Sequence, residues 1–204
     1  MARIAAVFVI ALLPLPAAAQ VCMGYPDSNR VPDVVGAWSS WEEVDTYSAE
    51  MRWSFSGPGH YFLRAHQSSV DEVDERIRGL TGGAVLSPSE LGGNICGVAS
   101  FGWERWSPAG VRIRHIQVPV GLAVGFQHRP SDGVVLAPFL HGYYMAESIN
   151  VQGGGRDQGG VWGVEPGIGV AFSSLLVRVS AAVEEQRSSD PRFRVELGVL
   201  GPSR

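Results

Sequence analysis

Apolar and polar residues alternate along most of the chain with a period of two. The segment 116–126 shows the pattern most clearly, because every second residue is apolar and the residues between them are small or polar. A period of two indicates a β-strand with one apolar face. The apolar positions of this segment are Ile116, Val118, Val120, Leu122, Val124 and Phe126.

Ten strands follow from this alternation, with eight or twelve as alternatives. Besides 110–127, strands are predicted over 32–41, 46–56, 60–67, 76–86, 92–104, 134–147, 162–172, 175–184 and 192–200. The joints between them alternate in length, with tight turns such as Ser173-Ser174 and 129–133 and longer loops at 104–110 and 150–160. Tight turns at one end and longer loops at the other are typical of an antiparallel up-and-down barrel in an outer membrane.

The face opposite the apolar stripe decides which side of the sheet meets water. In 116–126 that face holds Gln, Pro, Gly and Ala rather than the charged residues of a soluble surface. Eleven residues suffice for a tilted strand to cross the hydrocarbon, whereas soluble strands average about 5–6 residues. We therefore expect the apolar stripe to face lipid, together with the corresponding positions of 162–172. These further lipid-facing residues are Val164, Ile168, Val170 and Phe172.

Charged residues of both signs occupy the polar faces of four predicted strands. In a narrow lumen they could pair with one another, which favours an internal charge network over a row of solvated side chains. The predicted members of this lumen network are Glu50, Arg52, Glu165, Arg178, Arg194 and Glu196.

The N-terminus has the features of a secretory signal peptide. Arg3 precedes a short apolar run, and Ala17-Ala18-Ala19 supplies the small residues of a cleavage site. We predict a signal peptide at 1–19, a periplasmic segment at 20–31 and a β-barrel domain at 32–204. The net charge of −4 gives no basic footprint for nucleic acid.

Several segments resemble outer-membrane β-barrel proteins of bacteria, in the broad class of small OmpA-like and related barrels. They are VPVGLAVGF (118–126), VLAPFLHGYY (135–144), GVEPGIGVAF (163–172), LLVRVSAAVE (175–184) and FRVELGV (193–199). The resemblance implies location in the outer membrane, with membrane lipid and the barrel-insertion machinery as partners. Many such proteins end in an aromatic residue that this machinery reads. Because the chain ends GVLGPSR, either Phe193 or Leu200 would take that place or the barrel would follow a different insertion route.

The expected function is a passive one in the envelope: structural support, adhesion through surface loops, or passage of a small solute by a monomer. A wide aqueous channel is excluded, since it needs about 16–18 strands. The alternative is a soluble exported barrel that binds a small apolar ligand, because Gly36 and Trp38 form a GxW triplet similar to that of lipocalins. In that case the apolar stripe would face inward.

No catalytic centre, metal site or cofactor is predicted. The five histidines show no metal-binding spacing. His66 and Ser68 share a strand face, an arrangement that resembles the His-x-Ser of outer-membrane lipid A deacylases, but no matched acid is evident. A barrel enzyme acting on lipid is therefore the third and weakest hypothesis, because nucleophilic catalysis needs a positioned base and orienting group.

The two cysteines predict one disulfide, between Cys22 and Cys96, because exported proteins reach an oxidising compartment. Cys96 falls on the lumen face of its strand, opposite Ile95, Phe101 and Trp103 in parity. Bonding to Cys22 would draw the segment before the first strand under or into the lumen.

Overall fold

The computed structural model describes residues 22–25, 32–54, 59–70, 73–87, 94–185 and 190–200. The predicted signal peptide lies outside these residues. Two short 3-10 turns, η2 (Cys22–Gly24) and η4 (Pro108–Gly110), accompany the strands. The strands are β1 (Pro32–Trp41), β2 (Val44–Ser54), β3 (Gly59–Val70), β4 (Val73–Leu86), β5 (Ile95–Trp106), β6 (Ile113–Gly125), β7 (His128–Ser131), β8 (Val134–Val151), β9 (Arg156–Phe172), β10 (Leu175–Glu184) and β11 (Arg192–Leu200).

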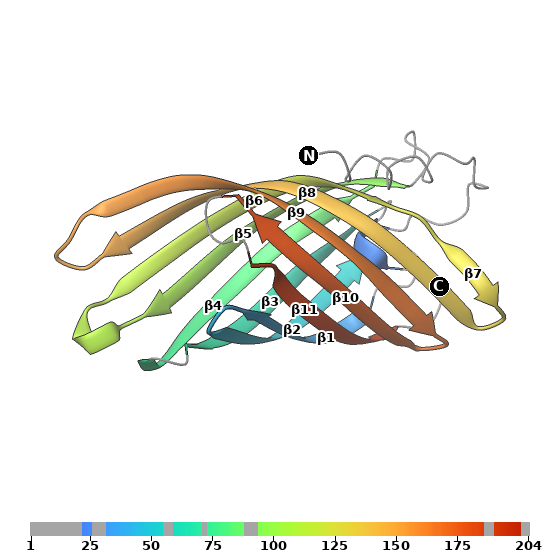
Figure 1. Cartoon of the computed structure of the whole chain (residues 1–204), viewed down its shortest axis with the longest axis horizontal. Helices are drawn as coiled ribbons and strands as arrows, with labels where there is room; N and C mark the ends of the chain where they lie inside the picture. Colours follow the sequence, from blue (N-terminus) through green and yellow to red (C-terminus); the bar gives the residue numbers. More distant parts are fainter. Residues whose placement is uncertain are drawn as a thin grey trace.

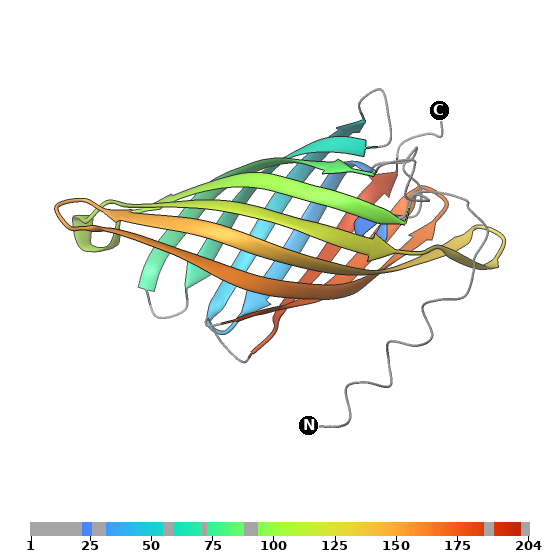
Figure 2. The ribbon, with the colours of Figure 1, turned by 90° about the horizontal axis from the view of Figure 1, so that it is seen from above.

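The strands form a closed antiparallel barrel (Figures 1 and 2). Each strand from β1 to β5 pairs with the next, β6 pairs with β8, each strand from β8 to β10 pairs with the next, and β11 pairs with β1. The four-residue β7 pairs only with the start of β8. Ten strands therefore make the wall, which confirms the predicted fold class. Among the described residues, no helix is long and apolar enough to cross a membrane.

The predicted strand bounds agree best with the observed ones where the alternation of apolar and polar residues continues unbroken up to a turn. β1, β10 and β11 begin and end at the predicted residues. The long loop predicted at 150–160 is wrong, because β8 runs to Val151 and β9 begins at Arg156, which leaves only 152–155 as the joint. Figure 2 shows the joint of β8 and β9 projecting well beyond the end of β10, with the joint of β5 and β6 beside it.

The predicted sorting of tight turns to one end of the barrel and longer loops to the other is wrong, because the two-residue joint 42–43 lies at the same end as 107–112, whereas 126–133 lies at the opposite end. We keep the predicted joints as names for the two ends. We call the end with the joints 126–133 and 173–174 the tight-turn end, and the end with 107–112 and 152–155 the loop end. The residues of η2 lie at the tight-turn end, where Tyr25 packs with Ala171, Leu176 and Leu200. Figure 1 shows η2 within the barrel, close to the strand ends on that side.

The two faces of the wall carry opposite kinds of side chain. On β6, Val120 and Leu122 are 46% and 64% exposed on the outer wall, whereas Ala123 is fully buried inside. On β11, Leu197 is 56% exposed while its neighbour Glu196 is fully buried. A soluble protein buries its apolar side chains and exposes its charges. The barrel has the reverse arrangement.

Glycines on the lumen face make room for large side chains from adjacent strands. A Cβ on Gly79 would clash with the His66 ring, and one on Gly163 would clash with Tyr143. Gly167 leaves comparable space for the ring of Phe139. This packing explains why the inward positions of β6 and β9 are so often small.

Candidate functional site

The lumen contains a cavity of about 430 Å³ that is lined by residues from all ten strands of the wall. Most of the residues that line it are polar, and they include arginines, glutamates, histidines and residues with hydroxyl groups. Because these groups alternate with the outward apolar residues, the same period of two that builds the wall also fills the lumen with charge. The lumen is the candidate functional site.

Glu196 of β11 is the centre of the charge cluster. Its carboxylate accepts a hydrogen bond from Arg194 Nε at 2.7 Å and is 2.8 Å from Arg178 Nη1. Arg52 Nη2 lies 3.6 Å from its second oxygen. Three guanidinium groups from β2, β10 and β11 therefore surround one carboxylate. This concentration of positive charge compensates the loss of water around Glu196.

Two further carboxylates complete the cluster. Glu165 of β9 accepts from Arg178 Nη2 at 3.1 Å and from Ser180 Oγ at 2.6 Å. Glu50 of β2 accepts from Arg52. The structure thus brings all six residues of the predicted network together in one cluster.

Arg64 of β3 is a member that the sequence did not identify. Its Nε donates to Glu50 at 2.7 Å. Arg64 is directly opposite Glu50 across the β2–β3 pair, so its inward position follows from the register. The signal was present in the sequence, but it could be used only once the pairing of the two strands was known.

Tyr25 seats the N-terminal residues on this charge cluster. Its hydroxyl donates to Glu196 Oε2 at 3.1 Å, and the guanidinium carbon of Arg52 lies 3.9 Å from the centre of its ring. The ring is thus held by a hydrogen bond and a cation–π contact. Tyr25 was also missed by sequence analysis, because it lies outside every alternating segment.

Gly24 brings this segment against the barrel wall. Its φ of +81° lies in the left-handed region that glycine adopts without strain. A Cβ on Gly169 of β9 would overlap the carbonyl oxygen of Gly24, so the two backbones meet where neither residue carries a side chain. The N-terminal residues therefore fit the wall closely at the tight-turn end.

Cys96 is fully buried on the lumen face of β5, beside Val85 and Ala123, with Met23 packed against them. The side chain of Cys22 lies outside the described side chains. The predicted disulfide between Cys22 and Cys96 therefore stays a prediction, and the contact of Met23 places the neighbouring residue of the chain beside this cluster.

A second polar cluster lies nearer the loop end. Glu104 of β5 accepts from His66 Nε2 at 2.9 Å and from His115 Nδ1 at 3.0 Å, and His115 Nε2 is 3.1 Å from Glu147. A histidine that faces carboxylates with both ring nitrogens donates from both only as the imidazolium ion. We call these four residues the His–Glu ladder. Sequence analysis missed it because the residues come from strands far apart along the chain.

His66 and Ser68 have different partners, which bears on the enzyme hypothesis. His66 bonds to Glu104, whereas Ser68 Oγ lies 2.7 Å from Thr46 Oγ1 on β2. A carboxylate, Glu104, therefore contacts His66, but among the contacts of the described residues none joins His66 to Ser68. Among the described residues, no group of three or more His, Cys, Asp or Glu side chains is arranged to hold a metal ion.

The residues expected to face lipid lie on the outer wall. Within the five stripe residues of β6 and the adjoining Phe126, exposure ranges from 36% at Ile116 to 64% at Leu122. Val164, Ile168 and Phe172 of β9 are 48%, 40% and 47% exposed, and Val170 is half-buried on the same face. The lipocalin alternative requires this stripe to face inward, which it does not.

Comparison with known proteins yields no relative by sequence. No protein-family model matches the chain, and no curated protein matches it. One solved structure, described as "KdgM porin in complex with disordered oligogalacturonate", is 8% identical with a TM-score of 0.36, and the match covers 84% of this chain and 99% of that chain. Another, from work described as "Unveiling the Mechanism Behind the in-meso Crystallization of Membrane Proteins", is 7% identical with a TM-score of 0.35 and 82% of each chain covered. The assignment of the fold rests on the strand pairing of this chain itself.

Proposed function

We propose that the chain is a bacterial outer-membrane β-barrel with a passive envelope role, and that its narrow polar lumen is a path for small polar solutes which the N-terminal residues keep closed. The observation that carries this proposal is the inverted wall, with Leu122 64% exposed outside and Glu196 fully buried inside. Lipid is the surroundings in which such a wall is favourable, because it solvates the apolar face and leaves water only for the lumen.

The lengths of the strands support the same proposal. The ten wall strands have between nine residues in β11 and eighteen in β8. A tilted strand needs about 9–11 residues to cross the hydrocarbon. Closure between β1 and β11 also satisfies the strand edges that an open sheet would expose to lipid.

Two features of the lumen support a solute path that is held closed. They are the polar residues that line the cavity and the position of Tyr25 inside it. A space of about 430 Å³ suits a small polar molecule. At the tight-turn end, Tyr25 lies inside the lumen, on Arg52 and Glu196. Passage therefore requires Tyr25 to leave this position. The soluble-binder alternative is not favoured, because the interior is charged rather than apolar.

Membrane insertion is tested with the full mature chain refolded in the presence of lipid vesicles. The barrel is expected to migrate faster on a gel before boiling than after it, and to remain with the vesicles after a wash at alkaline pH. Recovery of the folded protein in the aqueous fraction, without vesicles, would contradict the proposal.

Closure by Tyr25 is tested by ion conductance in planar bilayers. Tyr25→Ala removes the ring from the charge cluster, so its conductance should exceed that of the native chain. Tyr61→Ala is the matched control, because Tyr61 lies on the outer wall, 45% exposed. Equal conductance of Tyr25→Ala, Tyr61→Ala and the native chain would show that Tyr25 does not close the path.

A further inference from the structure

Three arginines form a row across the outer wall near the loop end. Arg78 of β4 is directly opposite Arg105 of β5, and Arg105 is directly opposite Arg114 of β6. All three are exposed. We call them the arginine row. Arg76, two residues from Arg78 on the same face of β4, adds a fourth exposed guanidinium group.

The arginine row differs from the arginines of the lumen in its lack of partners. Within the part of the chain that the structure describes, none of Arg78, Arg105 and Arg114 has an ion-pair partner, whereas Arg178 contacts two carboxylates. Like charges directly opposite one another on a sheet are destabilising. A row of three is therefore an arrangement that an external anion would stabilise.

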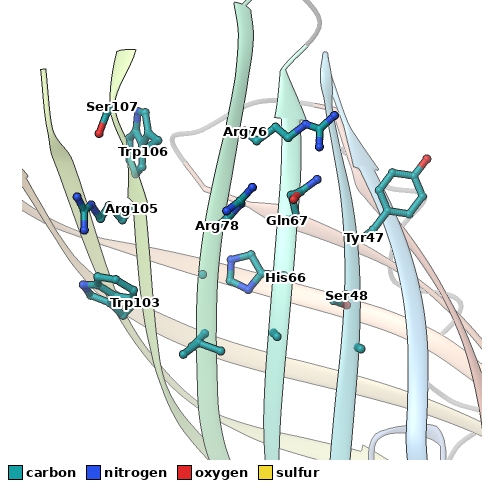
Figure 3. A pocket seen from close by; sticks show the side chains of 14 residues that line it. Tyr47, Ser48, His66, Gln67, Arg76, Arg78, Trp103, Arg105, Trp106 and Ser107 are labelled. Carbon is teal, nitrogen blue, oxygen red and sulfur yellow. The ribbon is translucent and has the colours of Figure 1, made fainter. Parts of the chain in front are cut away.

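A groove of about 990 Å³ lies beside the row on the outer wall. The floor of the groove is apolar. Ala49 and Ala65, whose side chains are small, are direct cross-strand partners, and Ala65 is directly opposite Leu80 of β4. Figure 3 shows Tyr47 on one side of the groove and Trp103 with Arg105 on the other, with Arg76 and Arg78 between them. The groove thus has cationic groups at one end and an apolar floor beneath.

The position of the row matches the edge of the apolar wall. The next residues towards the middle of the barrel are Leu80, Trp103 and Ile116, again in direct register across β4, β5 and β6. Aromatic side chains at this level are typical of the boundary between headgroups and hydrocarbon in membrane barrels. On the proposed function, the guanidinium groups lie at the depth of lipid headgroups.

We propose that the arginine row and the adjoining groove bind a phosphate-bearing lipid of the leaflet at the loop end. The guanidinium groups contact the phosphate, and an acyl chain lies over Ala49 and Ala65. Guanidinium suits phosphate because its planar donors form paired hydrogen bonds with two oxygens. This inference rests on the proposed membrane location of the barrel. A peptide or nucleic acid partner would fit poorly, since the floor of the groove is continuous with the apolar wall.

The test uses native mass spectrometry of the full mature chain in detergent, titrated with diphosphoryl lipid A and with its monophosphoryl form. Each of Arg78→Gln, Arg105→Gln and Arg114→Gln should weaken binding of the diphosphoryl lipid by about fivefold. Arg129→Gln is the control, because Arg129 is an exposed arginine of β7 at the opposite end of the barrel. Equal weakening by Arg105→Gln and Arg129→Gln would overturn the site, because only the total charge would then matter.

The groove is tested separately from the charge. Ala65→Phe fills its floor without changing a charge, and Ala99→Phe places the same side chain at another exposed outward position, on β5. Ala65→Phe alone should weaken lipid binding. Inorganic phosphate should not displace the lipid. Displacement by phosphate, together with an unaffected Ala65→Phe variant, would overturn the lipid as occupant. A dimer lost in Arg105→Gln would instead make the row a contact between two copies.

Failure of this inference differs from failure of the proposed function. Insertion of native chain and Arg105→Gln into phosphatidylcholine vesicles is measured first, and both should insert equally. A chain that does not insert contradicts the membrane barrel. A chain that inserts but shows no preference between the diphosphoryl and monophosphoryl lipids contradicts the lipid site alone.

Discussion

The outer wall and the lumen are built from the same ten strands, yet their side chains differ in polarity, exposure and contacts. On the outer wall, the side chains are apolar, separate and exposed, as at Val120, Leu122 and Leu197. In the lumen, Glu50, Arg52 and Glu196 are almost completely buried and are linked by ion pairs. The apolar side chains of the outer wall are stabilised by the lipid around them, whereas the charged side chains of the lumen are stabilised by specific ion-pair partners. Substitutions on the two faces should therefore fail for different reasons.

The largest effect is expected from a charge in the middle of the outer wall. Val120→Arg places a guanidinium group near the centre of the apolar stripe. It should destabilise the folded barrel in bilayers by about 2–4 kcal/mol. Ser131→Arg is the matched control, because Ser131 is exposed on β7 opposite Val134, beyond the edge of the apolar wall, where the cost falls to about 0–1 kcal/mol. The folded fraction is measured by heat-modifiable migration after refolding into vesicles. Equal folding of the two variants would abolish the distinction in depth.

A comparable loss of stability is expected when a charged residue of the lumen loses its ion-pair partner. Arg178→Ala leaves Glu165 and Glu196 with one guanidinium group fewer, and removing one member of a buried pair typically lowers stability by about 3–5 kcal/mol. Water in the lumen partly solvates the remaining carboxylates, so the loss of stability should be close to or below about 3 kcal/mol. Arg129→Ala, at an exposed site on β7, should change stability by less than about 0.5 kcal/mol. Urea unfolding in vesicles measures both, and an unchanged midpoint for Arg178→Ala would mean that the cluster does not hold the barrel together.

A smaller effect is expected in the His–Glu ladder. Glu104→Gln replaces the carboxylate that accepts from His66 and His115, and should lower the free energy of unfolding by about 1–3 kcal/mol. Glu43→Gln removes the same charge from the exposed turn between β1 and β2 and should have little effect. The same urea unfolding experiment compares them. If the two variants unfold at one midpoint, the ladder is a set of hydrated side chains.

Sequence alone predicted the number of strands, their antiparallel order and the bounds of β1, β10 and β11, because alternation is a local property. It was wrong about 150–160, where repeated glycines indicated a loop. In the structure, Gly160 lies in β9 and leaves room for the ring of Tyr144, which packs against Trp162 with the ring centres 4.9 Å apart. Glycine there makes space for an aromatic side chain rather than ending the strand.

The candidate site could be predicted only in part for a related reason. Parity placed Glu50, Arg178 and Glu196 on one face of their strands, but parity does not give the register between strands. Arg64 and the His–Glu ladder depend on that register, and the ladder alone connects residues eighty-one positions apart, from His66 to Glu147. Tyr25 depends on the shape of the lumen, which no local pattern records.

The central claim, that the outer wall faces lipid and the lumen faces water, is tested most directly by labelling successive positions of β6. Spin labels are placed singly at 117–120 and 122 in a background with Cys22→Ala and Cys96→Ala, and the refolded protein is studied in vesicles. Labels at Val118, Val120 and Leu122 should be relaxed by oxygen dissolved in the lipid, and those at Gln117 and Pro119 should not. A reversed alternation, or equal access of a water-soluble relaxation agent to both sets, would contradict the inverted barrel.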